Sequence, residues 1–454
     1  MEEKIQKNIN HLRDDILNNN KETFRKKFLS FHISNQAHIF NSLDTIEQER
    51  VFNLISPKEF APVLSKENVL KQKEIFDKFR TQSSTSSYLI KTLNYMNIDD
   101  LAKFLLQMET DQKNTIMDQL DENKTSELKK ILDYKPETAG SLMNIEFYSI
   151  NEFDTVGQVL DDLRKKAPDT ETIYYLYVID DSSNFLGVVS LRELVTSPTN
   201  EVISNIMNTN TITVNEYLDQ EKIAHCIQKY DLLAVPVTTE TNKLLGIITV
   251  DDIMDVMEQE VTEDFDDLTS TGGSSNLNLS VLTAAKRRSP WIIILMFLGL
   301  ITGSVIGRYE DTLESVVLLA VFIPMIMDSA GNIGTQALGV SVRGLALNQI
   351  KKGTFIKTIF REFLIGAIIG LLCMILIALL IIIIYGNTTL ALVVGVSMFC
   401  TFSISSVVGA IIPLFINKLK LDPAIASGPF ITTINDIIGL FIYFSIATSL
   451  MNYL

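Results

Sequence analysis

The sequence predicts a multidomain protein in which a short all-α helical solenoid and two small α+β modules precede a five-helix membrane part. Three observations lead to this prediction. Charge is divided unevenly, because residues 1–289 carry 47 acidic and 31 basic side chains whereas residues 290–454 carry seven and eight. Five long apolar stretches follow residue 290, and an internal repeat lies before it. A chain of 454 residues has room for several such domains.

The composition disfavours several classes of protein. The net charge of −16 over residues 1–289 argues against nucleic-acid binding, which needs a basic surface. The cysteines Cys226, Cys373 and Cys400 are too few and too widely spaced for a disulfide framework or a zinc cluster. No Ser/His/Asp, Walker or HExxH arrangement is present, so we expect a protein that is not an enzyme.

The N-terminal domain, residues 1–133, is predicted to be helical throughout. Hydrophobic residues recur there at helical spacing, and residues 39–55 resemble residues 104–120 at an offset of 65. Such a repeat is typical of a short helical solenoid. The serine- and threonine-rich residues 83–87 predict a loop between two of the helices.

Two copies of one α+β module follow, which we assign to residues 137–200 and 201–257. The segment LMNIEF that begins at Leu142 returns as IMNTNT at Ile206, and the later stretches LGVVS and LGIIT also correspond. Together with YLYVI and LAVPV, these stretches are rich in β-branched residues and predict two strands in each copy. The pattern resembles a tandem pair of CBS domains.

The CBS resemblance implies a paired disc that often binds an adenine nucleotide. The family's nucleotide position retains Arg192, with Glu193 beside it, so ATP is a possible ligand. The alternative is a plain scaffold that binds no nucleotide.

An acidic segment, residues 251–283, connects the repeat to the first apolar stretch. Nine acidic residues and no basic one occur among the 17 residues from Asp251 to Asp267. Like charges four residues apart destabilise an isolated helix. The segment is therefore either a solvated linker or a helix that divalent cations neutralise, and its position next to the membrane part favours the second interpretation.

The membrane part, residues 286–454, has five apolar stretches that approach or exceed the ~20 residues a spanning helix needs. They are residues 291–307, 315–342, 363–385, 390–416 and 424–450. Ten flanking basic residues lie on one side of these spans and only Arg308 lies on the other. The ten are Lys286, Arg287, Arg288, Arg343, Lys351, Lys352, Lys357, Arg361, Lys418 and Lys420. The positive-inside rule then places the N-terminus in the cytoplasm and the C-terminus outside a bacterial-type plasma membrane.

Two carboxylates inside the spans point to a cation pathway. Asp328 and Asp436 have no basic partner within a helical turn or two, and an ionised carboxylate at mid-bilayer costs roughly 2.5–3.5 kcal/mol. Either they face water or a cation, or they are protonated and bonded to a neighbouring helix. Asn332 and Thr432 carry polar groups nearby, and Asp422 marks the cytoplasmic mouth, ~21 Å from Asp436 if one helix joins them.

The order of these parts, with GNIGTQ at 331–336 and DPAIASGPFITTIND at 422–436, resembles the MgtE family of magnesium channels and transporters. The resemblance implies a homodimer in the membrane, with a pore lined by Asp436, Asn332 and Thr432 and entered at Asp422. It also implies regulatory Mg²⁺ positions, which are Asp219, Glu221, Asp231, Asp252, Asp255, Glu260, Glu263, Asp264 and the backbone at Gly140. In the helical domain Asp99 matches one expected acid, but Lys103 stands in place of the other.

These expectations describe a magnesium channel or transporter that takes up Mg²⁺ and closes when cytosolic Mg²⁺ binds the CBS pair and the acidic helix. Oxygen ligands suit a hydrated Mg²⁺ ion, and the spans offer no thiolate or imidazole cluster for softer metals. Two alternatives stay open. One is transport of another divalent cation, such as Mn²⁺, Co²⁺ or Ca²⁺, and the other is a membrane-anchored CBS sensor that transports nothing.

Overall fold

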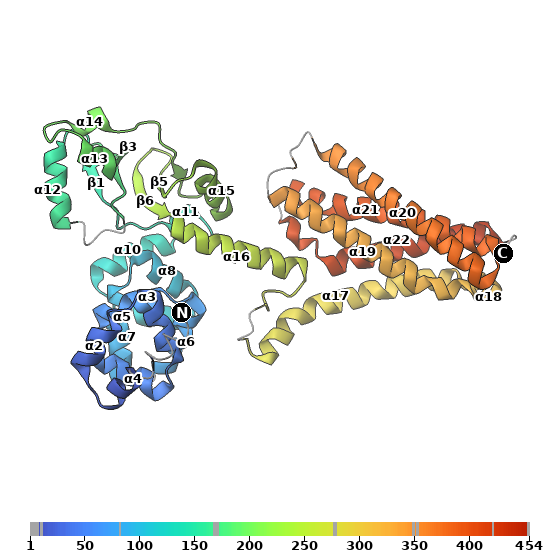
Figure 1. The fold of residues 1–454 in the computed structure, drawn as a ribbon, viewed down its shortest axis with the longest axis horizontal. Helices are drawn as coiled ribbons and strands as arrows, with labels where there is room; N and C mark the ends of the chain where they lie inside the picture. Colours follow the sequence, from blue (N-terminus) through green and yellow to red (C-terminus); the bar gives the residue numbers. More distant parts are fainter. Residues whose placement is uncertain are drawn as a thin grey trace. The chain divides into compact units, whose positions relative to one another are not determined.

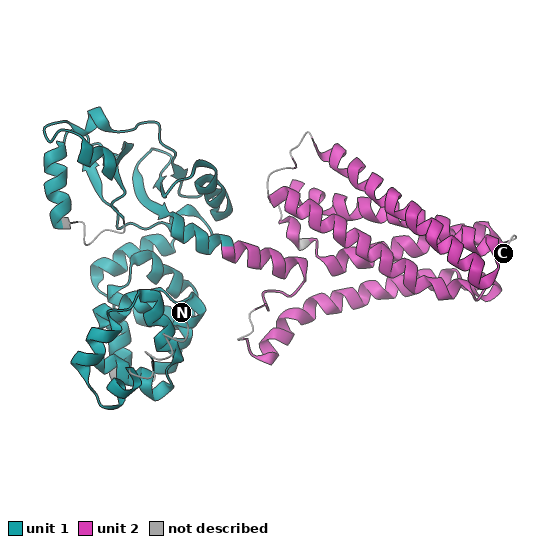
Figure 2. Cartoon of the chain, viewed as in Figure 1, with its two compact units in different colours: residues 1–257 teal, residues 258–454 magenta. Residues whose placement is uncertain are grey.

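The computed structural model describes residue 9 and residues 12–80, 83–166, 172–275, 279–346, 350, 354–419 and 422–451. Two units make up the chain, Met1–Met257 and Glu258–Leu454, which Figure 2 distinguishes by colour. The boundary between them lies within helix α16 (Val250–Leu268). The acidic segment therefore contributes its first residues to one unit and the rest to the other.

Short helices packed around one apolar core form the N-terminal domain, drawn from blue to cyan in Figure 1. They are α2 (Lys21–Phe28), α3 (Ile33–Ser42), α4 (Thr45–Leu54), α5 (Pro57–Ser65), α6 (Val69–Phe79), α7 (Ser83–Tyr95), α8 (Ile98–Leu106), α9 (Thr110–Met117) and α10 (Glu122–Leu132). The Phe52 ring contacts those of Phe60 and Phe79 edge to face, with centroids 5.2 and 5.1 Å apart. The predicted helical domain is confirmed.

The predicted loop at residues 83–87 is wrong, because α7 begins at Ser83. Serine and threonine favour turns in isolation. The same helix buries Leu89 and Leu93 completely in the core of the domain. This burial outweighs the weak local preference of the polar residues at the helix start.

Two α/β modules with identical sheet topology follow, drawn in green in Figure 1. Their strands are β1 (Ser149–Asn151), β2 (Tyr175–Ile179), β3 (Phe185–Ser190), β4 (Val214–Asn215), β5 (Ala234–Thr238) and β6 (Leu244–Thr249). Their helices are α11 (Ala139–Leu142), α12 (Val156–Lys166), α13 (Leu191–Thr196), α14 (Ile203–Ile206) and α15 (Gln220–Tyr230). In each sheet the first two strands are parallel and the last two antiparallel. The four predicted strands are present, and the very short β1 and β4 were missed.

The opening segment of each module pairs with the sheet of the other module. Asn144 pairs through its backbone with β6, and its counterpart Asn208 pairs in the same way with β3. At these crossings a Cβ on Gly187 would lie 2.5 Å from the Asn208 carbonyl oxygen, and one on Gly246 would lie 2.8 Å from that of Asn144. The two glycines are therefore required by the close approach of two backbones.

The second unit contains the apolar helices, drawn from yellow to red in Figure 1. They are α17 (Val281–Arg308), α18 (Glu310–Ser315), α19 (Leu319–Ala346), α20 (Phe355–Tyr385), α21 (Thr388–Lys418) and α22 (Gly428–Ser449), with the 3₁₀ helix η2 (Pro423–Ile425) before α22. Among the described residues, α17, α20, α21 and α22 have the length and hydropathy of membrane spans. Helix α19 is 28 residues and about 42 Å long, but its polar residues keep it outside that group.

Helix α21 packs against α19, α20 and α22 (Figure 1). Glycines mark the closest approaches. A Cβ on Gly366 of α20 would lie 2.6 Å from the carbonyl oxygen of Phe402, and a Cβ on Gly409 of α21 would overlap the carbonyl oxygen of Gly334 on α19. Small residues at such crossings let helix backbones approach closely, as in other membrane bundles.

The expectation that one helix joins Asp422 to Asp436 is wrong. Asp422 Oδ1 accepts a hydrogen bond of 2.8 Å from the backbone N–H of Ala424 and so caps η2, whereas α22 begins only at Gly428. Pro423 and Pro429 each lie in the first turn of their own helix, where proline is tolerated because no backbone donor is needed. Two helix starts therefore separate the two carboxylates.

Replacing Gly409 by alanine should destabilise the bundle, because the new methyl group would overlap the carbonyl of Gly334. We expect a loss of about 1–3 kcal/mol, the usual cost of an overpacked site. Gly303→Ala is the matched control, since a Cβ at Gly303 meets nothing within 4 Å. The temperature at which half of the detergent-solubilised protein aggregates measures the effect. Equal temperatures for the two variants would refute the close packing of α19 and α21.

Candidate functional site

One face of α19 carries a row of polar side chains. Asp328, Asn332 and Gln336 lie at intervals of four residues, and all three are exposed in the single chain. The amide of Asn332 donates to Asp328 Oδ2 at 3.3 Å. Lipid would leave these groups without hydrogen-bond partners, so the face suits contact with water or with another polar surface.

Helix α22 brings further polar groups to this face. A Cβ on Gly331 would lie 2.5 Å from the Thr432 methyl carbon, so the glycine permits the contact. The hydroxyl groups of Thr335 and Thr432 are 3.4 Å apart. One turn further along α22, Asp436 is half-buried and close enough to Asp328 for their charges to interact. The four predicted pathway residues of α19 and α22 therefore lie together.

Asn435 is a polar residue that the sequence analysis missed. It is fully buried, and its amide fills the space left by the lack of a side chain at Gly334. Both amide atoms of Asn435, and Oδ1 of Asp436, are buried without a hydrogen-bond partner among the described groups. Because such an atom costs about 1–3 kcal/mol, the site fits an ordered water or a hydrated ion. In the sequence, the only indication of a role for Asn435 is its position directly before Asp436.

The end of α16 lies against the segment that holds Asp422. Leu268 packs on an apolar cluster formed by the ends of α19, η2 and α22. Burial and the nearby charge of Asp422 raise the pKa of both Asp264 and Asp267, while Arg343 partly opposes the effect at Asp264. Ionised carboxylates at this contact therefore repel one another, and a bound cation would relieve the repulsion.

The segment after α16 is bonded to the first turns of α17. Arg287 donates from Nη1 to the carbonyl oxygen of Gly273 at 2.5 Å, and Arg288 donates from Nε to the Ser274 hydroxyl at 2.7 Å. In the sequence these arginines indicate only the orientation of the spans. The structure gives them a second role, because they tie the end of the acidic helix to the first apolar helix.

The predicted regulatory residues of the second module do not converge in one chain. Asp219 caps α15 and accepts a hydrogen bond of 3.1 Å from the backbone N–H of Glu221, whereas Asp231 ends the same helix with a φ of 51°. An 11-residue helix is ~16 Å long, so Asp231 lies far from the other two. Gly140 lies near the Asp219 end, where its N–H donates to the carbonyl oxygen of Glu216 at 2.8 Å.

The remaining predicted ligands extend along α16. Asp252 lies near its start, Asp255 and Glu263 are exposed, and Glu260 is half-buried. The described residues include no group of three or more His, Cys, Asp or Glu side chains placed to hold a metal ion. A divalent ion on this helix would therefore need water or a second chain to complete its coordination.

Asp99 is buried and already has a cationic neighbour. Its Oδ1 accepts a hydrogen bond of 3.2 Å from the side chain of Asn144, and Lys103 Nζ lies 3.8 Å from its Oδ2. Lys103 also donates to Asp252 Oδ1 at 2.7 Å. Burial would lower the pKa of Lys103, but Asp252 and Asp99 together raise it above its usual value. A lysine thus occupies the position between two predicted metal ligands.

The predicted nucleotide residues have unequal roles. Glu193 accepts hydrogen bonds from the backbone N–H and the hydroxyl of Ser190, at 2.9 and 2.8 Å, and so forms the capping box of α13. Arg192 beside it is exposed. Of these two residues, Arg192 therefore has the side chain that could bind a phosphate.

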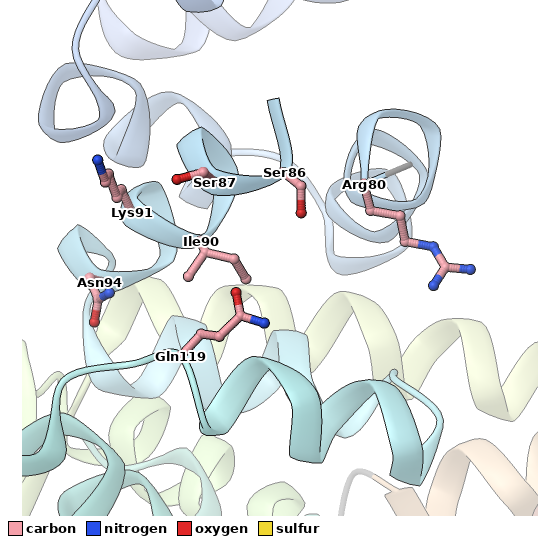
Figure 3. A pocket seen from close by; sticks show the side chains of 7 residues that line it. All are labelled: Arg80, Ser86, Ser87, Ile90, Lys91, Asn94 and Gln119. Carbon is pink, nitrogen blue, oxygen red and sulfur yellow. The ribbon is translucent and has the colours of Figure 1, made fainter. Parts of the chain in front are cut away.

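An open pocket of about 580 Å³ in the N-terminal domain lies apart from all these residues. Figure 3 shows Arg80 and Lys91 at opposite edges, with their charged ends pointing away from each other, while Gln119 reaches in from the turn between α9 and α10. The two cations do not converge on one ligand, so the pocket does not form an anion site.

Comparison with known protein families divides the chain into recognisable parts. Residues 323–446 match the MgtE divalent cation transporter model, residues 31–137 match the MgtE intracellular N domain, and residues 139–198 and 203–259 match the CBS domain. The helical domain, the CBS pair and the apolar region are thus each matched separately.

Curated relatives extend over nearly the whole chain. A magnesium transporter MgtE from Enterococcus faecalis is 36% identical over 442 residues, which cover 97% of both chains. One from Bacillus subtilis is 41% identical over 80% of both chains. Among solved structures, the soluble part of a magnesium transporter is 35% identical, with a TM-score of 0.53, and covers 56% of this chain and 99% of its own.

A second solved structure is the cytosolic domain of the Mg²⁺ channel MgtE in complex with ATP. It is 30% identical, has a TM-score of 0.50, and covers 54% of this chain and 98% of its own. With a relative of 36% identity matched along 97% of its length, the chain belongs to the MgtE family of divalent cation transporters.

Proposed function

We propose that this protein is a magnesium channel that takes up Mg²⁺ through a pore between two copies of the chain. The observation that carries the proposal is the polar face of α19, with Asp436 of α22 beside it. The relatives named magnesium transporter support the choice of cation.

The chemistry of the face suits a hydrated ion. Mg²⁺ dehydrates reluctantly and prefers one or two carboxylates with several waters. A two-fold axis beside this face would bring two Asp436 carboxylates to one site, while Asn332 and Thr432 bind waters of the hydration shell. The exposed face then becomes the inner wall of the pore, which removes the cost of placing it in lipid.

We also propose that the chain has five spans, with the CBS pair in the cytoplasm. Helix α19 then spans the membrane together with α17, α20, α21 and α22. Arg287 at the start of α17, Arg343 on α19 and Lys418 at the end of α21 then face the cytoplasm, and Arg308 faces outside. Lys351, Lys352, Lys420 and the C-terminal Leu454, which belong to the same prediction, lie outside the described residues.

The proposed gate is the acidic helix α16. Its end packs on the cytoplasmic ends of α19 and α22 next to Asp422, and Arg287 and Arg288 tie the following segment to α17. Cytosolic Mg²⁺ would neutralise the carboxylates, hold α16 in place and close the entrance. When Mg²⁺ is scarce, repulsion among the same charges would release it.

A regulatory nucleotide is proposed for the CBS pair. The ATP complex of the similar cytosolic domain supports it, and Arg192 offers the exposed charge. Since Glu193 is engaged in a helix cap, we assign phosphate contact to Arg192 alone.

Removing the charge of Asp436 should slow transport strongly, because two carboxylates would no longer offset the cost of moving Mg²⁺ through the bundle. We expect Asp436→Asn to lower Mg²⁺ uptake at least tenfold, or ~1.4 kcal/mol at the barrier. Asp311→Asn, which removes a carboxylate from α18, is the matched control and should transport normally. Growth rescue of a magnesium-auxotrophic strain measures uptake. Normal rescue by Asp436→Asn would end the pore assignment, whereas failure of the wild-type protein to rescue growth would favour a sensor that transports nothing.

The proposed topology places the two ends of α22 on opposite sides of the membrane. Alkaline phosphatase fused after Leu454 should therefore be active outside the cell, whereas the same enzyme fused after Lys418 should stay inactive in the cytoplasm. Activity is read from whole cells with a chromogenic substrate. If both fusions report the same side, the count of five spans is wrong.

Neutralising part of the acidic helix should weaken closure by Mg²⁺ without blocking conduction. The variant Asp255→Asn, Glu260→Gln, Asp264→Asn loses three carboxylates that bound cations would have to neutralise. We expect half-closure to require about tenfold more cytosolic Mg²⁺, since several weak sites act together. Patch-clamp current against cytosolic Mg²⁺ measures the shift.

The matched control removes the same charge from the exposed surface of the helical domain, with Glu109→Gln, Asp111→Asn and Asp118→Asn. Closure of the control should follow the wild-type concentration. If the α16 variant also closes at that concentration, α16 is only a linker.

A further inference from the structure

We propose that the ammonium group of Lys103 takes the place of a divalent cation between the N-terminal helical domain and the start of α16. The chain would then hold these two parts together without an ion. The two carboxylates that Lys103 joins, Asp99 and Asp252, were both expected to bind Mg²⁺, so the structure assigns them a different partner.

The geometry at this contact is that of an ion pair between two domains. Lys103 and Asp99 lie one turn apart on α8, and Asp252 lies 149 residues further along the chain. Lys103 Nζ is 2.7 Å from Asp252 Oδ1 and 3.8 Å from Asp99 Oδ2. The ammonium thus lies between carboxylates from two different domains.

The other carboxylate oxygens already have partners. Thr249 donates its hydroxyl to Asp252 Oδ2 at 2.6 Å, and Asn144 donates its amide to Asp99 Oδ1 at 3.2 Å. The side chains of Lys103, Asp252 and Asp99 are exposed by only 24, 14 and 6%. Both carboxylates are therefore oriented toward the lysine in a site that water screens poorly.

A magnesium ion does not fit this arrangement. It requires oxygen ligands at 2.0–2.1 Å in octahedral geometry and retains several waters. The ammonium already occupies the space next to Asp252, and its positive charge would repel a second cation at that distance. The fixed lysine charge supplies the neutralisation that a bound ion would otherwise provide.

This contact has a consequence for ion sensing. The docking of α8 on the start of α16 should not depend on Mg²⁺, so Mg²⁺ sensing would be left to the remaining carboxylates of α16 and the CBS pair. That consequence rests on the proposed function, whereas the lysine contact itself can be tested without any measurement of transport.

The test is hydrogen exchange of the full-length protein in lipid nanodiscs, followed by mass spectrometry of peptides that cover α8 and residues 249–254, which end before the carboxylates assigned to Mg²⁺. Each sample is measured in EDTA and in excess Mg²⁺. Wild type should show the same protection of these peptides in both conditions. Lys103→Arg keeps the charge and should behave likewise, as should Lys91→Gln, which removes an exposed lysine on α7.

Lys103→Asp is the decisive variant, because it exchanges the fixed cation for a further carboxylate. Its peptides should exchange about tenfold faster than wild type in EDTA and regain protection in Mg²⁺. The exchanged pair Lys103→Asp with Asp252→Lys should recover protection in EDTA, which a variant that merely failed to fold could not do.

Three results would overturn the proposal. They are loss of wild-type protection in EDTA, full protection of Lys103→Asp in EDTA, and equal exchange of Lys103→Asp with and without Mg²⁺. None of these readings depends on whether the protein conducts Mg²⁺, so they do not bear on the proposed function.

Discussion

The cost of a carboxylate in an apolar environment governs the second unit. Asp436 lies on a helix whose neighbours are mostly hydrophobic, and α19 offers it a polar face rather than a basic residue. The glycines Gly331 and Gly334 let α22 approach closely enough to place Thr432 and Asn435 against α19. The tight packing of α19 and α22 therefore brings their polar groups together. The proposed pore depends on this arrangement.

Like-charge repulsion governs the acidic helix in a comparable way. The two ends of α16 have different charged neighbours. At its start Asp252 is matched by Lys103, whereas at its end Asp264 and Asp267 face the further negative charge of Asp422. One end is thus neutralised by a lysine, whereas the other brings carboxylates together. Because hydrogen bonds from Arg287 and Arg288 connect the following segment to α17, the second end is where charge would act on the apolar helices.

Much of this architecture could be predicted from sequence, and the misses have physical causes. Long apolar stretches, the acidic run and β-branched strands have strong periodic or compositional signals, so α17, α20, α21, α22 and four strands were expected. Strands β1 and β4 have two or three residues and depend on parallel pairing with distant partners. The burial of Asn435 and the Lys103 bridge are tertiary contacts, which residue spacing does not reveal. The break between Asp422 and α22 depends on the local cap that Asp422 forms on η2.

The central claim is that the polar face of α19 and Asp436 conduct Mg²⁺. The most direct test is ion flux into proteoliposomes that contain only the purified protein, with Mg²⁺, Mn²⁺, Co²⁺ and Ca²⁺ supplied one at a time. We expect Mg²⁺ flux well above that of empty liposomes, and faster than the flux of any of the other three ions. Flux no greater than in empty liposomes for every ion would contradict a channel, and a faster flux of another ion would contradict the assignment of magnesium.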